Sequence, residues 1–264
     1  MMTKYPELKI TINNEQVTWE ETNRWAVKRA VHVLQQISDL GAELFLGNQV
    51  LDKNRIHTLS NNEILQACTD TKMKLGKQGI LDLYAPILQN TDKMWHNIKA
   101  KSQGNYKEAH TWVEAKGVNP KEIINLIMAD NDQDLMALAY KLHPEHYLGG
   151  INTDKSQEVM ETIGAYKEPT YFTLKIVANP TDEAPVTPDP NATIVMLGHI
   201  ILAADNFDTG AYAMHQFYIT DSGLKINLGL YIPSATPDEL VFNHNEHFAI
   251  EFGNAMKLIL DKTH

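Results

Sequence analysis

The sequence contains a single cysteine, Cys68, among its 264 residues. One thiol excludes an internal disulfide and a zinc site built from cysteines, and it is typical of proteins of the reducing cytoplasm. No run of about 18 apolar residues occurs, so no segment is predicted to cross a membrane. The N-terminus also lacks the basic and then apolar pattern of a signal peptide. We therefore expect a soluble, cytoplasmic protein.

Basic side chains are scarce too. The chain has 23 lysines and arginines against 33 aspartates and glutamates, which gives a formal charge of −10. Nucleic acids and anionic membranes are bound by clustered basic residues, and the sequence shows no such cluster. The glycine-rich nucleotide-binding motifs, HExxH and GxSxG are missing as well. These absences argue against nucleic acid and membranes as partners.

The first 140 residues are predicted to form a mainly helical domain. Thr18 and the glutamates that follow it are typical of a helix start, and Ser60 with Glu63 forms a capping-box pattern for a second helix that ends near Gly76. Apolar residues at helical spacing continue afterwards. The predicted helices cover residues 18–45, 60–76, 79–100, 105–117 and 119–142, and a short strand is predicted at 8–14.

The pattern changes in the second predicted domain, residues 141–264. β-Branched and aromatic runs with partial alternation predict strands at 158–164, 170–179, 192–205, 210–220 and 224–233. The TDSG segment before Leu224 predicts a hairpin turn, because Gly223 tolerates a positive φ. A long helix over 243–260 follows the last strand. We therefore predict an α+β protein whose antiparallel sheet, packed with a C-terminal helix, encloses a cavity for a small apolar molecule.

Histidines are concentrated in this second half, and two groups of them have spacings that suit metal ligands. His143 and His146 lie in "HPEH", which is predicted to be a loop because Pro144 ends the preceding helix. His247 and Glu251 are four residues apart on the closing helix and therefore share one face. Phe248 and Phe252 indicate that this face is buried. A buried carboxylate is costly without a partner, so a neighbouring cation would stabilise it.

Further ligands are expected from other elements, because two ligands hold no metal firmly. The strand at 158–164 offers Glu158 and Glu161, which point to opposite faces of a regular strand, and Glu161 is the better candidate. His143 and His244 are alternatives to His146 and His247. Oxygen and nitrogen ligands without sulfur favour Zn²⁺ over Mn²⁺ or Fe²⁺.

The order of these motifs resembles the phloretin hydrolase and 2,4-diacetylphloroglucinol hydrolase family. The residues that carry the resemblance are "YKLHPEH" at 140–146, a glutamate strand, His215 followed at matching spacing by Gly223 and Tyr231, and "EHFAIEFGNAMKLI" at 246–259. Enzymes of that family cleave a carbon–carbon bond between an acyl group and a phenolic ring. The resemblance covers roughly residues 140–260. It implies a helical N-terminal part and a Bet v 1-like (helix-grip) sheet closed by the C-terminal helix, with one zinc.

The resemblance also implies roles for individual residues. His146, Glu161, His247 and Glu251 are similar to the zinc ligands of the family. Tyr140, His215 and Tyr231 are similar to residues that contact the phenolic substrate. A histidine with a pKa near neutrality would suit the transfer of a proton to the departing ring carbon, so we expect His215 and Tyr231 to face the cavity.

Two functions are consistent with these patterns. The first is a zinc-dependent hydrolase that cleaves a carbon–carbon bond of an acylated phenolic or a β-diketone-like molecule. The second is a non-catalytic Bet v 1-like protein that binds an apolar or aromatic small molecule. The helical N-terminal part is expected to pack over the cavity or to build a homodimer interface.

Overall fold

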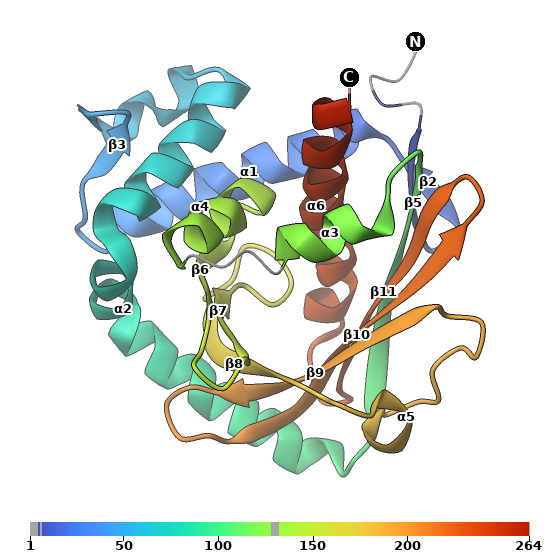
Figure 1. Ribbon diagram of the computed structural model, residues 1–264. Helices are drawn as coiled ribbons and strands as arrows, with labels where there is room; N and C mark the ends of the chain where they lie inside the picture. The colour runs from blue at the N-terminus through green and yellow to red at the C-terminus, as the bar shows by residue number, and fades with distance from the viewer. Residues whose placement is uncertain (1–4, 6, 128–131, 264) are drawn as a thin grey trace.

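The computed structural model describes residue 5, residues 7–127 and residues 132–263. Among these residues, nine strands form one sheet in the order β2-β1-β5-β11-β10-β9-β8-β7-β6, and all neighbours are antiparallel (Figure 1). The strands are β1 (Leu8–Ile12), β2 (Glu15–Val17), β5 (Tyr106–Lys116), β6 (His146–Ile151), β7 (Gln157–Glu161), β8 (Thr170–Ile176), β9 (Ile194–Leu202), β10 (Asp208–Thr220) and β11 (Gly223–Pro233). A separate hairpin joins β3 (Leu44–Leu46) to β4 (Gln49–Leu51).

The helices begin largely where the sequence predicts. They are α1 (Trp19–Asp39), a 3-10 helix η1 (Lys53–Thr58), α2 (Asn61–Ser102), α3 (Pro120–Ile127), α4 (Asp132–Leu142), α5 (Pro180–Glu183) and α6 (Asp238–Thr263). Complete capping boxes stand before α1, at Thr18 and Glu21, and before α2, at Ser60 and Glu63. No helix in the described part of the chain is long and apolar enough to span a membrane. The chain is an α+β protein.

Two helix predictions about the first half are wrong: the helix predicted over 18–45 ends at Asp39, before β3, and another predicted helix is a strand. Residues 105–117 were expected to be helical, but residues 106–116 form β5, a long strand between β1 and β11. Its buried residues Ala109, Thr111, Val113 and Ala115 recur with a period of two, which is the period of a strand. The helix predicted to end near Gly76 is confirmed, because this residue has the non-helical angles φ +63° and ψ 176°. A second helical segment follows the kink and reaches Ser102, and both segments lie within α2.

In the second half all five predicted strands are confirmed, as β7 to β11, and the TDSG turn joins β10 to β11. The strand β6 was not predicted. His146 is therefore the first residue of a strand, whereas His143 lies in the loop after α4 as expected.

The sheet combines β1, β2 and β5, which precede residue 140, with β6 to β11, so the predicted boundary at residue 140 lies within one continuous sheet. Helix α6 packs against β1, β5 and β11 and buries the larger apolar core between itself and the sheet. A second core lies between α1, α2, α4 and β6, on the other side of the molecule (Figure 1). The segment 143–147, which carries the histidine pair, lies where these two cores meet.

Candidate metal centre

Three elements bring imidazole and carboxylate groups to one point. His146 begins β6 and Glu161 ends β7, and the register of the two strands makes these residues direct partners. His247 approaches from α6, and Glu251 follows one helical turn later. His143 joins the group from the loop after α4. Residues more than 100 positions apart in the sequence therefore surround one buried site.

The distances between these groups are short. His146 Nε2 and His247 Nε2 are 3.1 Å apart. Glu161 Oε2 lies 3.4 Å from His146 Nε2 and 3.8 Å from His247 Nε2. Glu251 Oε2 lies 3.9 Å from His247 Nε2. Ligand atoms of His143, His146 and His247 all lie within 4.8 Å of one another, so this buried group of three histidines could hold a metal ion.

Hydrogen bonds to the other ring nitrogen determine which histidines can present a lone pair. His146 Nδ1 lies 3.0 Å from the carbonyl of Ala139, which can only accept, so Nδ1 carries the proton and Nε2 is free to bind a cation. His143 is the opposite case, because its Nδ1 accepts the N–H of Glu145 at 3.1 Å. The neutral ring of His143 therefore carries its proton on Nε2. This geometry favours His146 over His143 as a ligand.

His244 resembles His143 in this respect. Its Nδ1 accepts the N–H of Gly164 at 3.3 Å, which leaves the proton on Nε2. The ring stacks on His247, with centroids 4.6 Å apart, and lines the cavity beside the cluster. His244 therefore presents an N–H donor rather than a lone pair.

Two ring nitrogens of the cluster are buried without a hydrogen-bond partner among the described residues, His143 Nε2 and His247 Nδ1. Unpaired buried polar atoms are costly, and a catalytic role or a bound ion is among the reasons why a protein keeps them. The rings of His143 and His247 are stacked, with centroids 3.7 Å apart. The cluster thus keeps its shape through packing rather than through a closed hydrogen-bond network.

Burial keeps most of these imidazoles neutral. Desolvation, with the nearby Arg29 and His146 charges, lowers the pKa of His143, and desolvation with the neighbouring histidines lowers the pKa of His247. His146 differs, because the opposing effect of burial is outweighed by Glu161 and Glu251, and its pKa is raised. Burial raises the pKa of Glu251 to about 7. Neutral imidazoles are the form that binds a metal ion.

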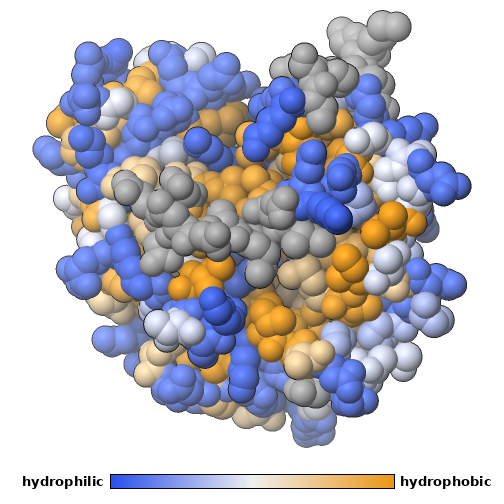
Figure 2. Space-filling model, viewed as in Figure 1, coloured by the Kyte–Doolittle hydropathy of each residue, from blue (hydrophilic) through white to orange (hydrophobic). Residues whose placement is uncertain are grey.

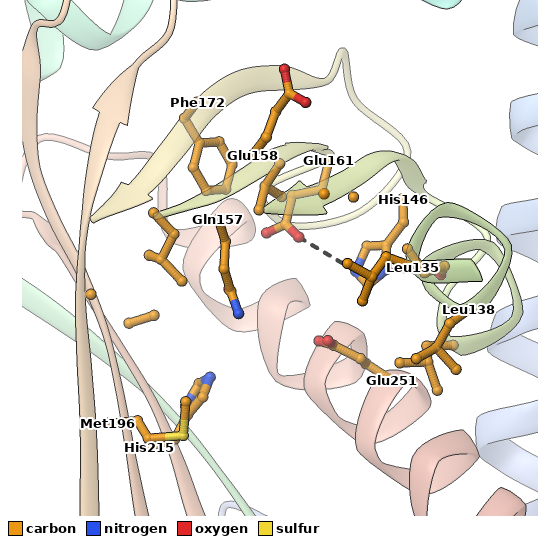
Figure 3. Close-up of a pocket in the computed structure, with 18 of the residues that line it drawn as sticks. Leu135, Leu138, His146, Gln157, Glu158, Glu161, Phe172, Met196, His215 and Glu251 are labelled. Atoms are coloured by element: carbon orange, nitrogen blue, oxygen red, sulfur yellow. Dashed lines mark hydrogen bonds and ion pairs between the residues drawn. The ribbon is translucent and has the colours of Figure 1, made fainter. Parts of the chain in front are cut away.

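The cluster opens onto a cavity of about 210 Å³ between α4, α6 and the strands β6 to β11. Its walls are mostly apolar, and apolar side chains also reach the surface in the middle of the view in Figure 2, near α3 and α4. In Figure 3, His146, Glu161 and Glu251 lie on one side of this cavity and His215 lies on the other. The apolar residues that line it include Leu135, Leu138, Phe172, Met196, Phe248 and Phe252.

Aromatic contacts with α6 hold the His215 ring in place. Its ring stands edge-on to Phe248 and Phe252 of α6, at 5.2 Å and 5.4 Å between centroids. Burial lowers its pKa to about 4. His215 is therefore neutral at pH 7, and the expected pKa near neutrality is wrong.

Three other residues singled out from the sequence lie away from the cluster. Glu158 points to the opposite face of β7 from Glu161, where it contacts Tyr171 and the ammonium of Lys77 (Figure 3). Tyr140 is buried and donates its hydroxyl to the carbonyl of Tyr147 at 2.8 Å. Tyr231 does not face the cavity as expected, because it packs with Leu197 and Met214 on the other face of the sheet.

One polar residue of the cavity, Gln157, was not predicted from the sequence. Gln157 shares the inward face of β7 with Glu161 and points toward the middle of the cavity (Figure 3). The signal was present, because residues four apart on a strand lie on the same face. Because Glu161 faces the cavity, the side chain of Gln157 must face it too.

Comparisons of the sequence with models of protein families and with proteins of curated function find no match.

The tautomers predict different effects for the two histidines of the HPEH segment. His146→Ala should lose bound metal, because it removes a free Nε2 lone pair, whereas His143→Ala should keep most of it. Metal analysis of the two purified variants tests this. The reverse result would move the ligand to His143, and retention of metal in both would point to His244.

Proposed function

We propose that the protein is a zinc-dependent hydrolase, with one Zn²⁺ per chain bound by His146, Glu161, His247 and Glu251. The supporting observation is the spacing of their ligand atoms. Four atoms that surround a tetrahedral zinc at about 2.0–2.2 Å must lie roughly 3.3–3.6 Å from one another. Four of the six separations among these atoms, 3.1, 3.4, 3.8 and 3.9 Å, lie near these values.

The chemistry of the donors supports zinc over harder cations. Two imidazoles with two carboxylates suit Zn²⁺, whereas Mg²⁺ and Ca²⁺ prefer oxygen ligands alone. The hydrogen bond from His146 Nδ1 to the carbonyl of Ala139 is the kind of outer contact that orients a metal-binding histidine.

We also propose that the fold is of the Bet v 1-like, helix-grip type, with α6 closing the curved sheet. The packing of α6 against β1, β5 and β11 supports this, as does a cavity between helix and sheet. The resemblance of residues 140–260 to the phloretin hydrolase family, noted above, supports the same fold and the same class of reaction.

The proposed reaction is the hydrolysis of the carbon–carbon bond between an acyl group and a phenolic ring. Water supplies a hydroxyl group to the acyl carbon, which leaves as a carboxylic acid, and a proton to the ring carbon. When bound, zinc would supply Lewis-acid polarisation of a carbonyl group or of water.

The remaining roles fall to side chains of the cavity. The apolar walls would hold the ring and exclude bulk water, while His244 would present its Nε2–H beside the acyl group. His215, across the cavity, would contact a ring hydroxyl as a neutral imidazole. A few polar groups in an apolar pocket are what orients a small ligand.

A second candidate function is the binding of an apolar or aromatic molecule without catalysis. The mostly apolar lining of the cavity favours it. In that case the histidine cluster would be structural. The two proposals differ in whether a metal is required.

Incubation with phloretin and with 2,4-diacetylphloroglucinol, followed by chromatography of the products, tests the proposed reaction. The zinc-loaded protein should release the acid and the deacylated phenol, and the protein stripped by a chelator should not. Binding of these compounds without any product, with or without zinc, would favour the second candidate.

Zinc affinity should depend steeply on pH near neutrality. Burial raises the pKa of Glu251 to about 7, so near neutrality this carboxyl group still holds part of its proton, which a metal must displace. The affinity should therefore rise as the pH increases from 6 to 8, with protons released on binding. Calorimetric titration in buffers of different ionisation enthalpy measures this release, and an affinity independent of pH would contradict it.

A further inference from the structure

Two fully buried basic side chains contact the chain segments that carry the cluster. Arg29 belongs to α1 and Lys72 to α2, and both are 0% exposed. Charged side chains are rarely buried, since removal of an ammonium or guanidinium group from water costs several kcal/mol. Neither residue lines the cavity. Their contacts indicate what offsets this cost.

Lys72 holds the backbone of the HPEH segment. Its Nζ donates to the carbonyl of Pro144 and to the carbonyl of His146, both at 2.7 Å. It also lies 4.4 Å from the centre of the Tyr140 ring. The two carbonyls flank Glu145, so the ammonium fixes the backbone on which the His146 side chain is mounted.

Arg29 connects all three segments that carry the cluster. It donates to Glu145 at 2.7 Å, in the HPEH segment, and to the carbonyl of Gly164 at 2.9 Å, just after β7. Its other terminal nitrogen donates to the carbonyl of Asn243 at 3.0 Å and contacts Glu246 at 3.2 Å, both on α6. One guanidinium group therefore ties together the chain beside His146, Glu161 and His247.

We infer that Arg29 and Lys72 are positioning residues of the proposed zinc centre, through which α1 and α2 hold the HPEH segment, the end of β7 and the start of α6 at metal-binding distance. This inference rests on the proposed function, because it requires a metal at the cluster. It also assigns a role to the N-terminal helices, which carry no ligand of their own. Outer contacts of this kind commonly change metal affinity by about 10–100-fold.

The test is the zinc affinity of Lys72→Met, measured by competition with a chromogenic chelator at a temperature well below unfolding. Methionine keeps much of the length and apolar character of the side chain but removes its three donors. We expect binding weakened by about 10–100-fold. Lys72→Arg, which keeps a cation and several donors, should recover part of the loss.

Thr71→Val provides a matched control. Thr71 is the neighbouring residue of α2, is equally buried, and accepts the N–H of Phe45 at 2.9 Å, away from the cluster. Its replacement should lower the melting temperature and leave zinc affinity unchanged. Affinity that falls equally in Thr71→Val would show that general destabilisation, not positioning, is responsible.

Wild-type affinity in Lys72→Met would overturn the inference while leaving the proposed function intact. Should Lys72→Met not fold, Glu145→Gln decides, because it keeps the size of the side chain and weakens its contact with Arg29. Weaker zinc binding by that variant supports the inference, and unchanged binding overturns it. A wild-type protein that binds no zinc would overturn the inference and the proposed function together.

Discussion

Replacing His247 with alanine is expected to abolish stoichiometric zinc binding. His247 is buried, and its Nε2 lies 3.1 Å from His146 Nε2, 3.8 Å from Glu161 Oε2 and 3.9 Å from Glu251 Oε2. Loss of one of the two imidazoles should weaken zinc binding enough for a chelator to remove the metal. Glu251→Ala should also bind zinc much more weakly, because it removes a carboxylate from the same face of α6.

Elemental analysis after dialysis against a weak chelator measures both effects. His57→Ala is a suitable control, because His57 is exposed and bonds only to Gln35 among the described contacts. That variant should retain one zinc per chain. Unchanged stoichiometric zinc in both His247→Ala and Glu251→Ala would remove the proposed site.

Replacing His215 with alanine should lower turnover strongly while leaving zinc content and fold in place. His215 lies across the cavity from the proposed ligands and contacts none of them in the described structure. Groups that orient the substrate or transfer a proton contribute about 10²–10⁴-fold to rate. Because burial holds the pKa of His215 at about 4, it acts as a neutral imidazole at pH 7, and a loss near 10²-fold is expected.

Met196→Leu is the matched control for this variant. Met196 is the cross-strand neighbour of His215 and also lines the cavity, but it offers no strong hydrogen bond. Its replacement should change turnover little. A His215→Ala protein that melts at a lower temperature but keeps normal activity per folded molecule would show that His215 is structural.

Local patterns predicted much of the fold. The two capping boxes mark the starts of α1 and α2, and the β-branched runs of the second half coincide with β7 to β11. The segment 106–116 was misread because its polar residues also fit a helical spacing. Its identity as β5 depends on pairing with β1 and β11, which are distant in sequence.

The histidine cluster, too, could be predicted from local patterns only in part. The spacing of His247 and Glu251 places them on one face of α6, and it needs no tertiary information. The choice between His143 and His146 could not be made in this way, because it depends on hydrogen bonds to Ala139 and to the backbone of Glu145. Arg29 and Lys72 gave no signal at all, since a single basic residue in an amphipathic helix is ordinarily exposed.

A crystal structure of the zinc-loaded protein, with anomalous differences measured at the zinc absorption edge, tests the central claim most directly. We predict one strong peak per chain, about 2.0–2.2 Å from His146 Nε2, His247 Nε2 and an oxygen of each of Glu161 and Glu251. A peak bonded instead to the Nε2 atoms of His143 or His244, or no peak within this cluster, would contradict the proposed zinc centre.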